Sequence, residues 1–390
     1  MMKSVRLGIV GVCGIGSAHL NCIASGKIDG MSLGAVCDID PSRIDYAKKV
    51  APGVSAFDDC REMFKSGKID AALISVPHPL HAEIAVSAFE AGLHVLVEKP
   101  EDISVSAARR LNAAAEASKK VFAIMFNQRT NPVFKQAREI VLSGRLGELK
   151  RSVWIITNWY RTQHYYDSGS WRATWSGEGG GVLLNQAPHN LDLWQWICGM
   201  PEEITAFCDV GKYHRIEVED DATIFARYKN GATGVFIAST GELPGTNRLE
   251  ISGTRGSLVV EQGRAVFRRL GFDEREICRS SSESCPSSDH ETEVYQPKGQ
   301  GSAHAGIIQN FCNAILYNEP LISPGAEGIN ELTISNAAYL SSWTGSAVRL
   351  PFDEELFDRL LDERRSASTV KNADGIQTHR DYSERWQVRF

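Results

Sequence analysis

The sequence predicts a two-domain α/β fold, in which a doubly wound parallel sheet is followed by an α+β domain with a large, open and mainly antiparallel sheet. Up to about residue 127, short apolar segments alternate with helical patterns, as in parallel sheets that helices cover on both faces. Beyond that point, segments of alternating polarity are separated by turn signals such as Lys229-Asn230-Gly231, as in antiparallel sheets. We therefore expect domains at 1–127 and 128–351, and a tail at 352–390.

The first predicted element is an apolar strand at residues 3–10, followed by a glycine-rich turn and a helix at about 17–25. Such a turn lets the backbone approach a pyrophosphate that lies on the amides of the helix N-terminus. Cys13 stands where a dinucleotide turn usually has its second glycine, so the match is imperfect. We predict a Rossmann domain, with a turn that binds no ligand as the alternative. The expected cofactor contacts are Gly11, Cys13, Gly14, Ile15 and Gly16.

The next predicted strand, residues 32–37, ends on Asp38. An acidic side chain about 20 residues after the glycine turn accepts hydrogen bonds from the ribose hydroxyls of the adenosine and repels a 2'-phosphate. The sequence therefore predicts NAD as the cofactor in preference to NADP. Arg43 is near enough in sequence to contact a phosphate and keeps this choice open, and a loop cap is the alternative role for Asp38.

Further strands are predicted at residues 71–77, 94–100 and 121–126, with helices at about 80–91 and 104–118 between them. Ligands of parallel sheets bind at the carboxyl ends of the strands. We therefore expect a second group of residues to border the cofactor: Ser75, Pro77, His78, His81, Glu98, Lys99 and Asn127.

Lys99 stands out within this group. Pro100 favours an extended conformation for the residue before it, and a buried strand end would point the ammonium group into the cleft. An ordinary ion pair with Glu98 or another acid is the alternative.

In the second domain, the segment 272–301 is rich in Ser, Glu and Gly and is expected to be a flexible excursion, and the tail beyond Pro351 is charged and uninformative. Because open sheets commonly leave a face for another subunit, we expect a homo-oligomer, a dimer or tetramer. Strands are predicted near 148–157, 203–210, 219–228, 232–239, 247–252 and 257–268, and helices near 304–317 and 325–346.

A helix is also predicted near residues 181–198. It would place three polar side chains, Asn185, His189 and Asp192, at positions i, i+4 and i+7 and so on one face. This stripe predicts polar groups that face the cleft. A core histidine satisfied by its neighbours is the alternative.

Seven aromatic residues between 154 and 175 are interleaved with polar side chains. Aromatic faces pack against the C–H face of a sugar while nearby polar groups bind its hydroxyls. Sheet packing or a subunit contact is the alternative, and Arg172 could instead bind the carboxylate of an acidic sugar. The expected substrate contacts are Tyr160, Arg161, Tyr166, Trp171 and Arg172.

The composition argues against several partners. A net charge of -6 without runs of like charge argues against nucleic acid and anionic membranes. No stretch approaches the 18 apolar residues typical of a membrane span. The nine cysteines form no C-x-x-C pair, which favours reduced thiols in the cytoplasm and predicts no metal site.

Four motifs, in order, resemble the glucose-fructose oxidoreductase, inositol dehydrogenase and MocA family (Gfo/Idh/MocA) over roughly residues 3–350. They are the glycine turn, "PHPLHAEIAVSAFEAGLHVLVEKP" ending at Pro100, "FNQRTNPVF" at 126–134, and the Gly-Gly-Gly stretch that runs to His189 and Asp192. The resemblance implies an NAD(P)-dependent sugar oxidoreductase.

In that family the Lys of Glu-Lys-Pro and the His of the second domain flank the carbon that exchanges hydride, which here implies Lys99 and His189. Arg129 of the third motif is expected to contact the substrate. The family usually has Asp four residues before the His, where this chain has Asn185. An amide cannot hold a negative charge there, so the usual triad is altered.

The resulting hypothesis is a dehydrogenase of a sugar, glycoside or polyol. His189 would be the general base, Lys99 would stabilise the alkoxide, and Asn185 and Asp192 would position the His. One alternative keeps the same residues but recycles bound NAD internally, oxidising C3 of a glycoside before an elimination. A less favoured alternative is a non-catalytic sensor of NAD and sugar.

Overall fold

The computed structural model describes residues 4–287, 289–299 and 301–369. The first of its two sheets has six strands: β1 (Val5–Val10), β2 (Met31–Cys37), β3 (Ser55–Phe57), β4 (Ala71–Ile74), β5 (His94–Val97) and β6 (Phe122–Ile124). They are all parallel, in the order β3-β2-β1-β4-β5-β6. From β1 the chain adds β2 and β3 on one side, and then β4, β5 and β6 on the other. Parallel sheets of this type bind their ligands at this switch point, between β1 and β4. The predicted Rossmann fold is confirmed.

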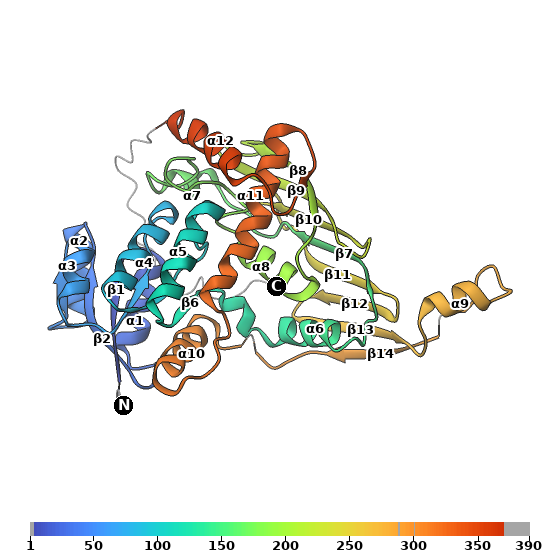
Figure 1. Cartoon of the computed structure of the whole chain (residues 1–390), viewed down its shortest axis with the longest axis horizontal. Helices are drawn as coiled ribbons and strands as arrows, with labels where there is room; N and C mark the ends of the chain where they lie inside the picture. Colours follow the sequence, from blue (N-terminus) through green and yellow to red (C-terminus); the bar gives the residue numbers. More distant parts are fainter. Residues whose placement is uncertain (1–3, 288, 300, 370–390) are drawn as a thin grey trace.

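Helices pack on both faces of this sheet (Figure 1). They are α1 (Ile15–Ala24), α2 (Pro41–Val50), α3 (Cys60–Lys65), α4 (His81–Glu90) and α5 (Val105–Ser118), with the short 3-10 turns η1 (His78–Leu80) and η2 (Asn127–Thr130). Three of these elements, α2, β3 and α3, were not predicted from the sequence. Strand β3 has three residues and α3 has six, too few for a hydrophobic period to be read.

The second sheet has nine strands: β7 (Leu149–Ile156), β8 (Glu203–Val210), β9 (Glu219–Arg227), β10 (Thr233–Ser239), β11 (Asn247–Gly253), β12 (Gly256–Glu261), β13 (Arg264–Leu270), β14 (His290–Tyr295) and β15 (Val348–Arg349). Their order is β14-β13-β12-β11-β7-β10-β9-β8-β15. Only β10 and β7 run parallel; the other neighbouring strands are antiparallel. The large, mainly antiparallel sheet is therefore confirmed.

Two predictions for this sheet are wrong. The segment 257–268 is a hairpin rather than one strand, because Gln262 and Gly263 adopt positive φ angles and turn the chain. The segment 272–301 contains α9 (Glu274–Ser280) and the edge strand β14. All six residues of β14 are exposed, so its sequence lacks the apolar alternation of a half-buried strand. Helix α9 projects beyond the end of the sheet (Figure 1).

Further helices follow the first sheet along the chain. They are α6 (Pro132–Leu142), α7 (Gln163–Asp167), α8 (Pro188–Cys198), α10 (Ala303–Tyr317), η3 (Gly325–Glu327) and α11 (Gly328–Thr344). Helix α11 packs against α8, α5 and β8. Helix α10 instead places Ile307, Ile308 and Phe311 in the core of the first sheet, although it lies outside residues 1–127. No helix of the described residues is both long and apolar enough to cross a membrane.

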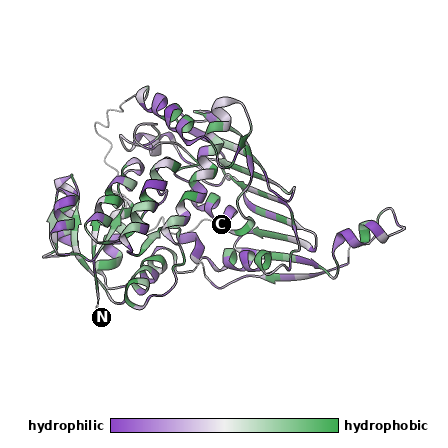
Figure 2. Cartoon of the chain, viewed as in Figure 1, coloured by the Kyte–Doolittle hydropathy of each residue, from purple (hydrophilic) through white to green (hydrophobic). Residues whose placement is uncertain are grey.

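The prediction of an uninformative tail is wrong for residues 354–366. Helix α12 (Glu354–Ser366) buries Phe357 and Leu361 in the core of the second domain. Figure 2 shows hydrophilic and hydrophobic residues alternating along it, as expected for a surface helix. The rest of the predicted tail, from residue 370 on, lies outside the described residues.

Candidate functional site

The glycine-rich turn after β1 packs closely against the end of β4. A Cβ atom at Gly16 would lie 1.9 Å from the carbonyl oxygen of Gly11, and one at Gly11 would lie 2.6 Å from that of Ser75. Gly14, in contrast, has open space at its Cβ position and a φ of +51°, and Cys13 beside it is exposed. The turn is therefore tight on the protein side and open at the N-terminus of α1, where a pyrophosphate fits.

The surrounding charges also suit a dinucleotide. Helix α1 begins at Ile15 and has no acidic residue in its first turn, so nothing there repels a phosphate. Asp38 at the end of β2 accepts hydrogen bonds from the backbone nitrogens of Val12, at 2.7 Å, and Asp40, at 3.0 Å. These contacts fix a carboxylate beside the turn. Arg43 lies 3.8 Å from Asp40, which draws its guanidinium toward that carboxylate.

Replacing Asp38 by alanine is expected to narrow the preference for NAD over NADP. The carboxylate offers acceptors to ribose hydroxyls and repels a 2'-phosphate, so its removal should weaken NAD binding roughly tenfold and leave NADP binding equal or tighter. Fluorescence titration with both cofactors measures this change. Arg43→Ala is the matched control, and it should change the affinity for NAD and the affinity for NADP only slightly. If the unmodified protein binds NADP more tightly than NAD, the proposed role of Asp38 is wrong.

Most of the residues predicted to border the cofactor do lie at the carboxyl ends of the strands. The side chains of several of them already form hydrogen bonds within the protein. Ser75 donates its hydroxyl to Gly11 at 2.7 Å. Both ring nitrogens of His81 contact backbone carbonyls, those of Pro100 and Val76, so His81 joins two loops. Pro77 precedes η1, His78 contacts the backbone oxygen of Glu178, Glu98 contacts His19, and Asn127 contacts His304.

The structure brings Lys99 and the His189 loop together. Lys99 Nζ donates a hydrogen bond to the backbone oxygen of Asn185 at 2.7 Å. His189 lies in the first turn of α8, edge-on to Phe126 at 6.3 Å between ring centroids. Burial, and second the charge of Lys99, hold the pKa of His189 well below its ordinary range. The imidazole is therefore neutral at neutral pH and able to accept a proton.

The predicted helix at 181–198 begins only at Pro188, so Asn185 lies in a turn and shares no helical face with His189. Backbone packing explains the difference. A Cβ at Gly181 would lie 1.9 Å from the carbonyl oxygen of Glu219, whose carboxylate also accepts from the backbone nitrogens of Gly181 and Leu183. Glu219 thus holds the glycine-rich loop in a non-helical shape.

The residues of the aromatic segment differ in their surroundings. Tyr166 is 2% exposed and hydrogen-bonds to Thr240 at 2.7 Å, so it packs in the core. The ring of Trp171 lies edge-on to His78, at 5.7 Å. Arg172 lies over the rings of Trp171 and Tyr165, while Arg161 lies over Tyr165 and Tyr160 is 38% exposed.

Tyr165 is a polar centre that the predictions left out. Its hydroxyl accepts from Arg172 at 2.7 Å and lies 3.3 Å from the amide nitrogens of Asn185 and Gln186. Burial opposes ionisation, but the charges of Arg172 and Arg161 lower the pKa of this hydroxyl overall. The sequence holds no signal that separates Tyr165 from Tyr166.

Asp192 and Arg129 form a fully buried ion pair. Arg129 donates to both oxygens of Asp192, at 2.8 and 2.6 Å, and also to Glu327. Gln195 donates to the same carboxylate at 3.0 Å. The predicted role of Asp192 in positioning His189, and that of Arg129 in binding substrate, stay predictions. Besides each other, Asp192 contacts Gln195 and Arg129 contacts Glu327.

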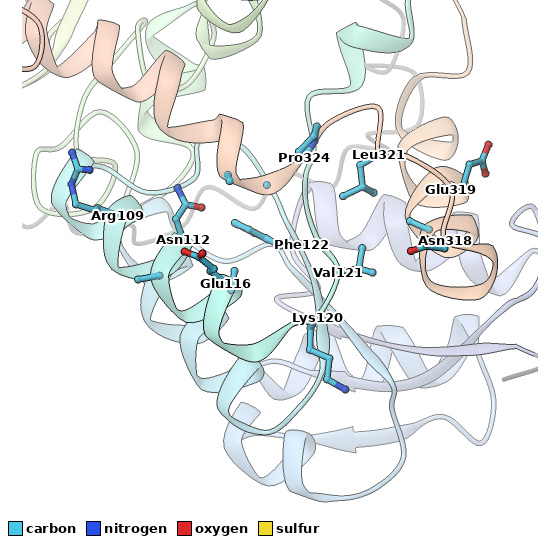
Figure 3. A pocket seen from close by; sticks show the side chains of 15 residues that line it. Arg109, Asn112, Glu116, Lys120, Val121, Phe122, Asn318, Glu319, Leu321 and Pro324 are labelled. Atoms are coloured by element: carbon cyan, nitrogen blue, oxygen red, sulfur yellow. The ribbon is translucent and has the colours of Figure 1, made fainter. Parts of the chain in front are cut away.

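A cavity of about 690 Å³ lies elsewhere, between α5, β6, α10 and the turn before α11 (Figure 3). Phe122 and Pro324 form part of its apolar wall, and Arg109 and Lys120 lie on its border. None of the predicted site residues lines it. The predicted site at the strand ends around Lys99 therefore lies apart from this cavity.

Two buried acids stand out because their carboxyl groups are unpartnered within the described part of the chain. Glu331 in α11 and Glu101 after β5 are fully buried, and neither carboxyl group has a hydrogen-bond partner among the described residues. Burial raises the pKa of both carboxyl groups well above the ordinary value. A neighbouring acid raises it further, Asp192 in the case of Glu331 and Asp102 in the case of Glu101.

Glu331→Gln is expected to stabilise the protein, more so at higher pH. Because the folded state raises the pKa of Glu331, ionisation favours the unfolded chain, and stability is lost as pH rises above the unfolded pKa. The neutral amide avoids this loss. Melting at pH 8 should rise by roughly 2–4 °C, with little change near pH 4.

Glu219→Gln is the control for that prediction. Burial also raises the pKa of Glu219, to about 7. Unlike Glu331, however, Glu219 accepts hydrogen bonds from Gly181, Leu183 and Tyr339. Its replacement should lower the melting temperature. A Glu331→Gln protein that melts below the unmodified one at pH 8 would show that this carboxylate has a stabilising partner.

Comparison with known proteins matches two parts of the chain to family models. A family model described as oxidoreductase family, NAD-binding Rossmann fold, matches residues 5–126, and the GFO/IDH/MocA C-terminal domain matches residues 134–259. Inositol 2-dehydrogenase of Corynebacterium glutamicum (strain R) is 34% identical over 200 residues, 51% of this chain and 56% of the relative. The chain thus spans little more than half the length of that relative.

Two relatives match over most of the chain. Uncharacterized oxidoreductase YrbE of Bacillus subtilis is 25% identical over 363 residues, 91% of this chain and 99% of the relative. The crystal structure of the WlbA dehydrogenase from Bordetella pertussis, in complex with NADH and UDP-GlcNAcA, is 25% identical with a TM-score of 0.75, and covers 90% of this chain and 100% of that one. The chain belongs to the GFO/IDH/MocA family of oxidoreductases, and its first domain is the family's NAD-binding Rossmann fold.

Proposed function

We propose that the chain is an NAD-dependent dehydrogenase that transfers hydride between a secondary alcohol of a sugar, glycoside or polyol and nicotinamide. The observation that carries the proposal is the contact of Lys99 with the loop that leads to a neutral His189. Further support comes from a relative named inositol 2-dehydrogenase and from a structural neighbour that holds NADH and UDP-GlcNAcA.

When bound, NAD supplies the hydride acceptor for the alcohol carbon. The glycine turn and Asp38 would hold it, for the packing and charge reasons given above. His189, neutral at the working pH, would accept the hydroxyl proton. The ammonium group of Lys99 would stabilise the negative charge that develops on the substrate oxygen. Burial lowers the pKa of Lys99 while Glu98 opposes that shift, so a proton can also leave it more readily than from an exposed lysine.

A panel of sugars, glycosides and inositols, assayed with NAD by NADH absorbance, tests this proposal. At least one alcohol should give steady NADH production that depends on both substrates. No turnover with any of them, despite NAD binding, would contradict it. NADH that forms but stays bound during turnover would favour the alternative of internal recycling.

We also propose that the open face of the second sheet is a subunit interface. Phe207 in β8 is 70% exposed and Phe225 in β9 is 36% exposed. The register pairs Phe207 with Thr223 and Thr205 with Phe225, which puts both rings on one face of the sheet. An exposed apolar patch of this kind suits a second copy of the chain, and the mass of the protein in solution decides it.

A further inference from the structure

The buried carboxylate of Glu178 contacts Asn185, the residue to which Lys99 donates a hydrogen bond. Asn185 receives the hydrogen bond of Lys99 on its backbone oxygen, at 2.7 Å. Its side-chain nitrogen donates to Glu178 and lies 3.3 Å from the hydroxyl of Tyr165. Glu178 is 1% exposed and directly precedes the glycine-rich loop. Asn185 therefore links Lys99 to a buried acid.

The hydrogen bonds of Glu178 favour its ionised form. One carboxylate oxygen accepts from Asn185, and the other accepts from the backbone nitrogen of Ala173 at 2.5 Å. The backbone N–H of Ala173 can only donate, so it favours a carboxylate over a carboxyl group that would itself need an acceptor. Burial raises the pKa of Glu178, and the charge of Arg172 is the largest influence that lowers it.

An ionised Glu178 fixes which way round the Asn185 amide lies. A carboxylate cannot donate a hydrogen bond, so the amide atom that faces it has to be the NH₂ group. The carbonyl oxygen Oδ1 then points elsewhere. Among the described residues none donates to Oδ1 of Asn185, and the residue is half-buried. Oδ1 is thus an acceptor still available in the residue that contacts Lys99.

We propose that Glu178 is a positioning residue, which holds the Asn185 amide so that Oδ1 accepts a hydrogen bond from a second hydroxyl group of the substrate. The inference rests on the dehydrogenase function proposed above. A buried acceptor without its partner is costly, so an analogue of the substrate that lacks this second hydroxyl should be used less efficiently.

Exchanging the two groups tests the proposal. Asn185→Asp sets two carboxylates in contact and removes the donor that Glu178 needs, so kcat/KM should fall by about 100-fold, the scale of a misplaced contact. In Glu178→Gln, the new NH₂ group can face Asn185 and make the Asn185 amide turn round. We expect kcat/KM to fall roughly 5–20-fold. The double variant should recover to within about tenfold of the unmodified enzyme, since the amide that Glu178→Gln introduces would then donate to the new carboxylate at position 185.

The measurements use the best alcohol of the panel, with melting curves and NAD titrations to show that each variant is folded. Asn230→Asp is the matched control, since Asn230 also donates to a glutamate, Glu148 at 3.2 Å, but on the surface; its kcat/KM should change less than twofold.

Two results would overturn the inference while the unmodified enzyme stays active: a double variant no better than Asn185→Asp, or a Glu178→Gln enzyme with unchanged kcat/KM. An unmodified enzyme that oxidises no alcohol of the panel would instead refute the proposed function itself.

Discussion

His189→Ala is expected to lower kcat by about 10²–10⁴-fold while NAD affinity stays nearly unchanged, which is the range for the loss of a positioned acid-base group. His189 lies in the first turn of α8, outside the nucleotide-binding sheet, so cofactor binding has no reason to fail with it. Lys99→Ala should cause a loss of the same order. Steady-state assays and NAD titration measure both effects.

The double variant decides whether the two residues share one step. If Lys99 and His189 act on the same proton transfer, their combined replacement should cost much less than the product of the single losses. Lys120→Ala, on the border of the cavity between α5 and α10, is the control and should be nearly silent. Multiplicative losses, or a His189→Ala enzyme with near-normal kcat, would show that another group is the base.

The pH profile gives an independent check. A general base must be deprotonated, and the pKa of His189 is held well below its ordinary range by burial and by Lys99. The activity of the unmodified enzyme should therefore persist below the pH of roughly 6.5 at which an ordinary histidine is half protonated. Lys99→Met removes a positive charge beside the imidazole and should move the acidic limb to higher pH.

The sequence predicted what is encoded locally. Apolar strands, glycine turns and the residues that end β2 and β5 follow from short-range patterns, and so Asp38 and Lys99 were assigned to the correct strand ends. The shape of the loop around Asn185 could not be predicted, because it is set by Glu219, which lies on a strand far along the chain. Helical spacing alone suggested one polar stripe where the structure has a turn followed by a helix.

Contacts between distant polar residues were missed for the same reason. Glu178 directly precedes the glycines, which is a visible signal, but nothing in the sequence shows that its partners are Asn185 and Ala173. Tyr165 and Tyr166 are adjacent and chemically alike, yet the hydroxyl of Tyr165 contacts Arg172 and that of Tyr166 contacts Thr240. Only the fold separates them.

Asp192→Asn should cause the largest loss of stability. Arg129 is fully buried and donates twice to Asp192; its other acidic partner, Glu327, has a side chain that is 41% exposed. Removing one partner of a buried ion pair leaves an uncompensated charge and typically costs about 3–5 kcal/mol. Urea denaturation measures this loss, and Glu83→Gln, which breaks an exposed pair with Arg61, should leave the midpoint nearly unchanged.

The same pair separates a structural role from a catalytic one. Replacing both partners by apolar side chains, as in Arg129→Met with Asp192→Leu, removes the buried charge as well as its partner and should recover much of the stability lost in the single variant. If Asp192 only supports the fold, the recovered protein should also regain most of its kcat, because His189 lies on the same helix and keeps its backbone position. Recovered stability without recovered kcat would instead show that Asp192 acts on His189, as the spacing of the two residues in the sequence first suggested.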